Sequence, residues 1–157
     1  MKTLVAYYSR TGITKKVAGF IAEALEADIE EIVDTKNRKG VMRFMVACKD
    51  GIMKKTGEIG PVEKTPSDYD LVVIGTPVWA NTFTPAVRKY LADYGQDLKK
   101  AAVFCTTAKS GIESTTRGMS EMIDGETIAA AGFREKHVKK DEHIEALQEF
   151  ISKIRPA

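Results

Sequence analysis

Short, fully apolar runs alternate with segments of helical periodicity along this 157-residue chain. The apolar runs have no polar alternation, which predicts strands buried on both faces of a sheet. Between them, apolar residues recur at intervals of three and four, as at Val17, Phe20, Ile21 and Leu25, which predicts helices with one buried face. Regular alternation of strand and helix predicts a parallel sheet, because right-handed crossovers return the chain to the same edge.

The whole pattern predicts five strands and five helices. The strands are expected at Lys2–Tyr8, Asp28–Val33, Leu71–Ile74, Ala101–Thr106 and Thr127–Phe133. The helices are expected at 12–26, within 39–55, at 84–94 with Thr84 as N-cap, at 114–123, and from a cap at Asp141 to 154. This series fits an α/β fold: one domain over 1–157, with a doubly wound five-stranded parallel sheet in the order 2-1-3-4-5 and helices on both faces.

Composition excludes several functional classes. The 24 Lys and Arg nearly balance the 22 Asp and Glu, and the net charge of +2 argues against a dedicated nucleic-acid binder. No apolar run approaches the roughly 20 residues of a membrane span. Cys48 and Cys105 lie far apart in the sequence, which disfavours a disulfide scaffold or a cysteine-based zinc site. We therefore expect a cytoplasmic protein with no membrane span and no nucleic-acid partner.

The loop after the first strand has the composition of a phosphate site. It contains three hydroxyl residues and one glycine directly before a helix: Ser9, Arg10, Thr11, Gly12, Ile13 and Thr14. A helix N-terminus attracts anions through its unpaired N–H groups and its dipole, and Gly12 allows a close backbone approach. An ordinary capping loop would need only one hydroxyl. The loop also follows the strand at which the predicted sheet order reverses, where ligands of such folds bind.

Other phosphate-binding motifs are absent. The chain has no G-x-x-x-x-G-K-[ST] and no G-x-G-x-x-G after the first strand, which excludes a P-loop and a dinucleotide fingerprint. A receiver domain has the same predicted topology but needs acids at the ends of its first and third strands. Here those ends carry Tyr7-Tyr8 and Ile74-Gly75.

The segment Tyr8–Thr14 resembles the phosphate loop of the flavodoxin family, usually written [ST]-x-T-G-x-T. Residues 70–85 resemble the family's third strand and flavin-binding loop, and 104–111 are similar in place to its third loop. The match spans nearly the whole chain and is closest to the short-chain members. The resemblance implies non-covalently bound FMN, with Ser9, Thr11, Gly12 and Thr14 on its phosphate.

Trp79 is the only tryptophan, in an expected polar turn where it could stack on a flavin. Phe83 is a second candidate for that role. Alternatively, Trp79 only covers the third helix. The candidate cofactor contacts are Ser9, Arg10, Thr11, Gly12, Ile13, Thr14, Thr76, Pro77, Val78, Trp79, Asn81, Thr82, Phe83, Thr106, Thr107, Ala108 and Gly111.

Charge separates this chain from acidic flavodoxins. The three candidate loops contain Arg10 and Lys109 and no acid, which would favour an anionic reduced flavin. We therefore hypothesise a less negative reduction potential than in acidic members of the family. The basic run Arg134–Lys140 is interpreted as a solvated loop.

The leading functional hypothesis is an FMN-dependent electron carrier that works between a reductase and an acceptor protein. The sequence shows no acid–base constellation, which favours a carrier over an enzyme with its own substrate. An NAD(P)H- or quinone-dependent oxidoreductase, or a porphyrinogen oxidase, on the same fold is the alternative. A flavin-free interaction domain is a third possibility. Monomer and homodimer both stay open.

Overall fold

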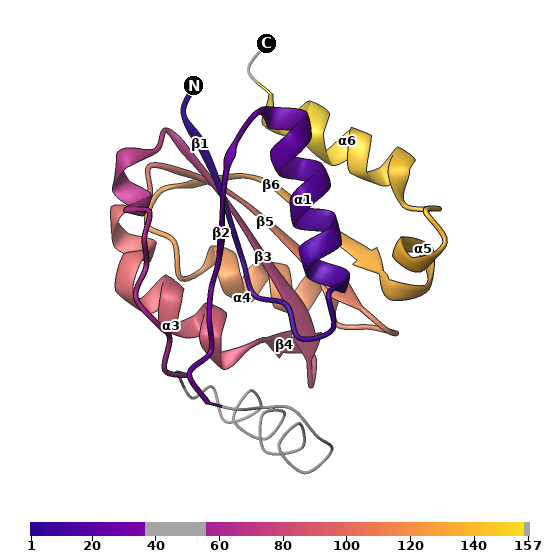
Figure 1. Ribbon diagram of the computed structural model, residues 1–157, viewed down its shortest axis with the longest axis horizontal. Coiled ribbons are helices and arrows are strands. Elements are labelled where there is room, and N and C mark those ends of the chain that lie inside the picture. Colours follow the sequence, from indigo (N-terminus) through magenta and orange to yellow (C-terminus); the bar gives the residue numbers. More distant parts are fainter. Residues whose placement is uncertain (37–55, 156–157) are drawn as a thin grey trace.

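A computed structural model describes residues 1–36 and 56–155 (Figure 1). Its parallel strands are β1 (Thr3–Tyr7), β2 (Asp28–Glu31), β3 (Leu71–Trp79), β5 (Lys100–Thr107) and β6 (Glu126–Arg134). They form a sheet in the order β2-β1-β3-β5-β6. Counted among the parallel strands alone, this is the predicted order 2-1-3-4-5, so the predicted doubly wound fold is confirmed.

Helices cover both faces of the sheet (Figure 1). They are α1 (Ile13–Leu25), α3 (Pro85–Tyr94), α4 (Ile112–Ser120), α5 (Glu135–Lys139) and α6 (Ile144–Ile154), with short 3-10 turns at Pro66–Asp68 and Gly95–Asp97. One core layer contains Val17 of α1 and Leu147 of α6, and the other contains Val87 of α3 and Met119 of α4. None of the described helices has the length and apolarity that crossing a bilayer requires.

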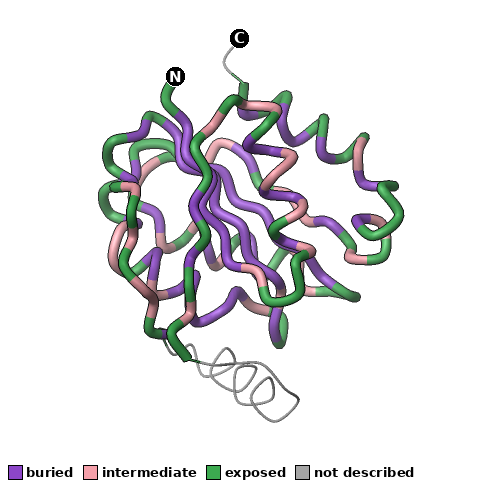
Figure 2. Tube along the Cα trace, viewed as in Figure 1, coloured by how far each residue is buried: buried purple, intermediate pink, exposed green. Residues whose placement is uncertain are grey.

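The central strands β1, β3 and β5 are buried almost throughout (Figure 2), with Val78 half-buried and Lys100 exposed. Successive residues of β1 contribute to opposite core layers, with Leu4 and Ala6 in one and Val5 and Tyr7 in the other. A strand between two helical layers must be apolar at every position, which explains why these runs show no alternation. Cys105 of β5 is also fully buried, and burial raises the pKa of its thiol to about 12.

One expected loop is a hairpin. The end of β3 turns back into β4 (Thr82–Phe83), which pairs with it in the antiparallel direction and adds a sixth strand. Ala80 and Asn81 make the turn, with φ of 52° and 60°. Positive φ at both central residues gives the turn the twist that a tight hairpin needs. Alanine rarely adopts this conformation, so no sequence signal pointed to the turn.

A second difference lies near the C-terminus. The basic run expected as a solvated loop contains α5, and the last helix begins at Ile144 with His143 at its N-cap position, rather than after a cap formed by Asp141. Asp141 instead forms an ion pair with Lys16 of α1, at 2.8 Å. The helix expected within 39–55 lies outside the described residues.

Candidate functional site

The loop after β1 enters α1 through Gly12, whose φ is 93°. Its turn is closed locally, because the Gly12 N–H donates to Ser9 Oγ at 3.1 Å. No side chain caps α1 among the described residues, and the first turn contains no acid. The Lys16 N–H donates to the Gly12 carbonyl at 3.0 Å as the helix begins. The positive end of the helix dipole is therefore available to an anion.

An open pocket lies beside this helix start. It contains about 500 Å³ of empty space, part of it continuous with solvent. It is lined by Arg10, Thr11, Ile13, Thr14, Pro77, Val78, Trp79, Thr106, Ala108 and Glu135. The pocket thus gathers residues from the carboxyl ends of β1, β3 and β5, the edge at which ligands bind in this topology.

The buried hydroxyls of Thr14 and Thr106 join two walls of the pocket. Their Oγ1 atoms are 2.8 Å apart, and both residues are almost fully buried. Thr14 was expected at the cofactor phosphate, and its hydroxyl is hydrogen-bonded to Thr106 of β5. Because a hydroxyl has one donor and two acceptor positions, the pair keeps further hydrogen-bonding capacity toward the pocket.

Trp79 both borders the pocket and belongs to the core. Its residue is 4% exposed, and its ring meets that of Tyr8 edge-on at 5.5 Å. Stacking on a flavin and covering the third helix, the two roles left open by the sequence, are therefore compatible for Trp79. Phe83, the second aromatic candidate, lies in the core beneath the Arg88 guanidinium, 3.9 Å from its ring centre, and is absent from the pocket lining.

Several polar residues expected at the site are used within the protein. Thr76 Oγ1 donates to the Pro77 carbonyl at 2.9 Å and accepts from the Thr84 N–H at 3.2 Å. These bonds fix the start of α3, where Thr84 also caps the helix as expected. Thr82 Oγ1 accepts from Arg88 Nη2 at 3.1 Å. Neither Thr76 nor Thr82 lines the pocket.

The third candidate loop is bound to the hairpin. Ser110 Oγ donates to Asn81 Oδ1 at 3.3 Å, and Ser114 Oγ donates to the Asn81 carbonyl at 2.8 Å. Gly111 has φ of 92°, and a Cβ added there would lie 3.0 Å from Asn81 Cα. Thr107 Oγ1 donates to the Ser110 carbonyl at 2.7 Å. Gly111 was expected to admit a ligand, whereas here it admits the hairpin.

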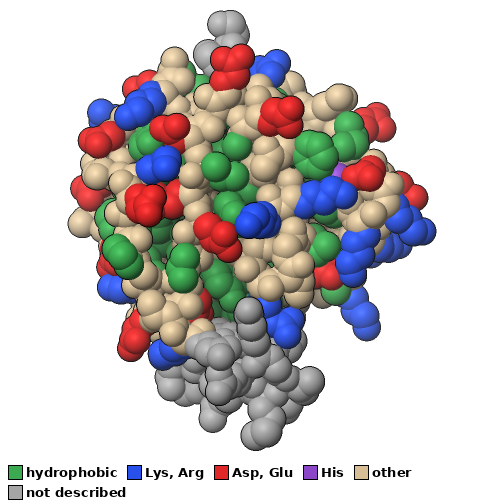
Figure 3. Space-filling view, viewed as in Figure 1, with side chains coloured by type: hydrophobic (Ala, Val, Ile, Leu, Met, Phe, Trp, Pro, Cys, Tyr) green, Lys and Arg blue, Asp and Glu red, His purple; other side chains and the backbone are tan. Residues whose placement is uncertain are grey.

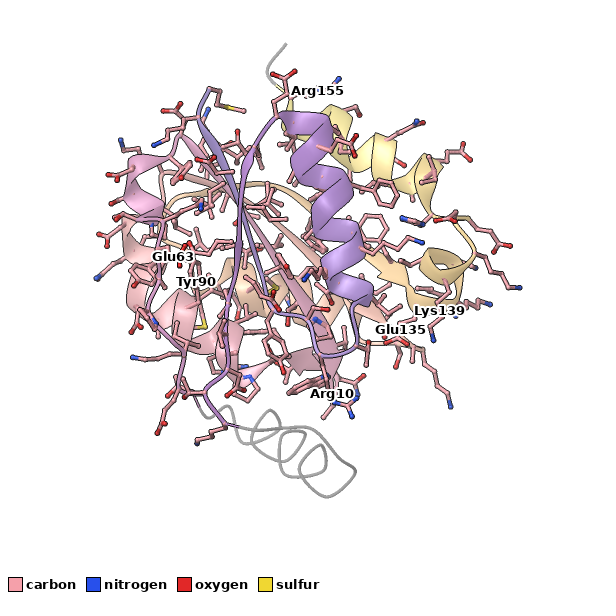
Figure 4. All side chains as sticks on the ribbon, viewed as in Figure 1. Arg10, Glu63, Tyr90, Glu135, Lys139 and Arg155 are labelled. Carbon is pink, nitrogen blue, oxygen red and sulfur yellow. The ribbon has the colours of Figure 1, made fainter. Side chains whose placement is uncertain are left out.

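Glu135 is the one pocket residue that the sequence analysis missed. It is the first residue of α5 and follows directly after β6. Figure 4 shows it near Arg10, at the same end of the molecule. Parallel strands end at a common edge, so the residue after the last strand was a candidate from topology alone. Glu135 was overlooked because residues 134–140 were interpreted as a solvated loop.

Comparison with known proteins identifies a family and a fold. A family model described as Flavodoxin matches residues 2–151. A flavoprotein from Lactobacillus acidophilus, solved in complex with FMN, is 23% identical with a TM-score of 0.71, covering 94% of this chain and 98% of that chain. No match was found among curated protein sequences.

Two enzymes have related structures. An NADH:FMN oxidoreductase in its apo form is 13% identical with a TM-score of 0.64, covering 97% of this chain and 87% of that chain. An NADPH-quinone reductase from P. pentosaceus is 10% identical with a TM-score of 0.58, covering 100% of this chain and 99% of that chain. Likeness at these identities establishes the fold that the three proteins share with this chain.

Proposed function

The chain belongs to the flavodoxin family, and on that premise we propose that it binds FMN and carries electrons between a reductase and an acceptor protein. The observation that carries this function is the uncapped start of α1, which opens into the same pocket as Pro77, Val78 and Trp79. An anion site thus adjoins a largely apolar wall. FMN has the matching parts, a phosphate at one end and a flat aromatic ring at the other.

The loop after β1 would hold the phosphate. The first N–H groups of α1 and the Thr11 hydroxyl would donate to phosphate oxygens, as at other helix N-termini. Arg10 would add a positive charge at the pocket wall. The positive φ of Gly12 exposes the backbone here, and a Cβ at this position would meet no atom within 4 Å.

The rest of the pocket would hold the sugar-alcohol chain and the ring. Pro77, Val78, Trp79 and Ala108 supply apolar surface, and the Glu135 carboxylate can accept hydrogen bonds from ribityl hydroxyls. When bound, FMN supplies the electron-transfer chemistry. The protein's part is to hold the phosphate, orient the ring and exclude water from one of its faces.

The charged groups of the pocket favour a carrier. Among its lining residues, the only ionisable side chains are Arg10 and Glu135, and there is no histidine or cysteine. A pocket without an acid–base pair suits electron transfer to and from a partner protein. The positive charges of Arg10 and Lys109 favour a less negative reduction potential than in acidic flavodoxins, and Glu135 acts against them. Potentiometric titration of the wild type and of Glu135→Gln, which we expect to have the higher potential, measures both effects.

Cofactor titration tests the proposal directly. FMN and riboflavin are added separately to apo-protein, and quenching of flavin fluorescence gives each affinity. Because hydrogen bonds to a charged group contribute about 1.5–3 kcal/mol each, we expect FMN to bind at least about a hundredfold more tightly. Equal affinities would contradict a phosphate site at α1, and a protein that stays colourless after mixing with FMN and desalting would contradict the function.

A reductase that uses NAD(P)H is the second candidate. The exposed basic residues Lys136 and Lys139 favour it, because they belong to α5, which begins at the pocket residue Glu135. Anaerobic mixing of the FMN-loaded protein with NADPH or NADH distinguishes the two. A carrier keeps its oxidised flavin absorbance until a partner reductase is added, whereas an enzyme loses it with the nucleotide alone.

A further inference from the structure

The amino ends of the parallel strands form a negative end of the molecule. For three of these strands, we consider the first residue together with the three residues before it. Each of these segments contains two acids and no base. These acids are Glu26 and Asp28 at β2, Asp68 and Asp70 at β3, and Asp124 and Glu126 at β6. At the other two strands, Lys2, Lys99 and Lys100 reduce this negative charge without cancelling it, and Asp97 adds to it.

The opposite end is positive on the side of β5 and β6. Five exposed cations follow these strands, and we call them the basic rim: Lys109, Arg134, Lys136, Lys139 and Lys140. None of the five forms an ion pair with another residue of the described ranges 1–36 and 56–155. Figure 3 shows Lys and Arg side chains gathered over the region of α5, and Figure 4 places Lys139 near Glu135.

The basic rim adjoins the mouth of the pocket. Lys109 follows the pocket residue Ala108, and Arg134 and Lys136 flank the pocket residue Glu135. Of the nearby acids, Asp141 is paired with Lys16, whereas Glu142 is exposed and reduces the positive charge on this side. At the far side of the sheet, β2 ends with acids at 31 and 34, so the positive surface is confined to one side of the pocket.

We propose that the basic rim docks the acidic face of a redox partner protein over the pocket, an inference that rests on the proposed function. The five cations are exposed and spread over two segments, and none of them lines the pocket. A small phosphate ligand needs donors that converge on one point. Separated, solvated charges instead match the polar rim of a protein interface.

The charge separation also orients the approach of such a partner. An acidic face is attracted to the basic rim and repelled by the negative end of the sheet, so encounters bring it to the pocket. The net charge of +2 conceals this, because it sums two ends of opposite sign. Long-range attraction of this kind weakens as salt shortens the screening length.

Charge reversal at matched positions tests the inference. Lys136→Glu/Lys140→Glu alters the basic rim, and Lys99→Glu/Lys100→Glu makes the same change in net charge at the negative end. The probes are a reduced acidic [2Fe–2S] ferredoxin, mixed anaerobically with the protein carrying oxidised FMN, and oxidised basic cytochrome c, mixed anaerobically with the protein carrying reduced FMN. Flavin absorbance follows electron transfer to the flavin in the first case and from it in the second. With the ferredoxin, we expect the rate constant to fall as ionic strength rises from roughly 0.01 M to 0.5 M.

At low salt, the two variants should react with the ferredoxin at different rates. We expect the rim variant to react with the ferredoxin about tenfold more slowly and the control variant to change by less than about twofold. Equal effects of the two variants would overturn the proposal, since net charge alone would then account for them. A rate constant with cytochrome c that falls as salt rises would also overturn it, because it would show attraction of a basic partner.

Two further measurements separate this proposal from that of the cofactor. Chemical shifts of ¹⁵N-labelled apo-protein titrated with the ferredoxin should change at the basic rim whether or not FMN binds, and changes confined to the amino ends of the strands would contradict docking there. FMN titration of both variants should give the wild-type affinity. If NADPH alone reduces the flavin and the rim variant loses that reaction, the cations serve a dinucleotide and the proposed protein docking is wrong.

Discussion

Helices α1 and α4 begin in the same way but have different surroundings. Each follows a glycine in the left-handed conformation, Gly12 with φ of 93° and Gly111 with φ of 92°, and neither has a side-chain cap. A Cβ at Gly12 would meet nothing within 4 Å, whereas one at Gly111 would lie 2.8 Å from Val78 Cγ1. The first turn of α4 contains Glu113, and that of α1 contains no acid.

Of these two similar loops, only the one before α1 leaves its helix start open to a ligand. Around α4, the hairpin fills the space and the hydroxyls bond to neighbouring carbonyls, as Ser114 does to Asn81. Around α1, the space is open and the helix start borders the pocket. A glycine before a helix therefore indicates a binding site only where the tertiary structure leaves the helix start exposed.

Replacing each of the two glycines by alanine should give the largest difference in stability between the two helix starts. Gly12→Ala adds only the cost of a left-handed alanine, about 1–2 kcal/mol. Gly111→Ala adds the same cost and also crowding against Val78, so we expect a loss of about 3 kcal/mol or more. Urea unfolding of both variants measures the difference, and similar losses would mean that the hairpin is not packed on Gly111.

Threonine-to-valine substitutions should affect FMN affinity at one loop and stability at the other. Thr11 borders the pocket, so Thr11→Val should weaken FMN binding by about 1.5–3 kcal/mol, more than tenfold, with little change in stability. Thr107 already bonds to Ser110, so Thr107→Val should lower the unfolding free energy by about 1 kcal/mol and leave FMN affinity unchanged. Flavin fluorescence and urea unfolding give the two quantities, and the reverse pattern would contradict the assignment of the phosphate loop.

The hairpin turn offers a stabilising substitution on the α4 side. Ala80 has φ of 52°, a conformation in which an L-residue is strained by roughly 1–2 kcal/mol and glycine is not. Ala80→Gly should therefore raise the unfolding free energy by about 0.5–1 kcal/mol, after the greater chain entropy of glycine is subtracted. A destabilised variant would contradict the positive φ, and Ala108→Gly in the neighbouring loop serves as the control.

Acid should weaken the α1 side. His143 is buried against Phe20 of α1, and burial lowers its pKa below the ordinary value of 6.5. The unfolded chain then binds more protons than the native one, so this contribution is complete above that value and is lost as the pH falls below it. Unfolding between pH 5 and 8 should show this slope and His143→Phe should reduce it, while hydrogen exchange should show α1 loosening before α4.

The strands and the glycine turn before α1 could be predicted because their signals are local. A run such as Leu71–Ile74 must be apolar throughout to lie between two helical layers, and Gly12 before a helix is a short-range backbone signal. The hairpin could not be predicted, since Ala80 has no preference for its conformation. Helix α5 has only Val138 buried, so its five residues carry no apolar periodicity.

Local sequence patterns were enough to predict the alternation of strand and helix and the position of the glycine turn before α1. Each depends on residues that are neighbours in the chain. Which polar groups stay available to a ligand depends on contacts between distant residues, such as the one between Thr14 and Thr106. It could therefore be seen only in the tertiary structure. The tertiary structure also decided that acids gather at one end of the sheet and cations beside the pocket, since parallel strands bring their like ends together.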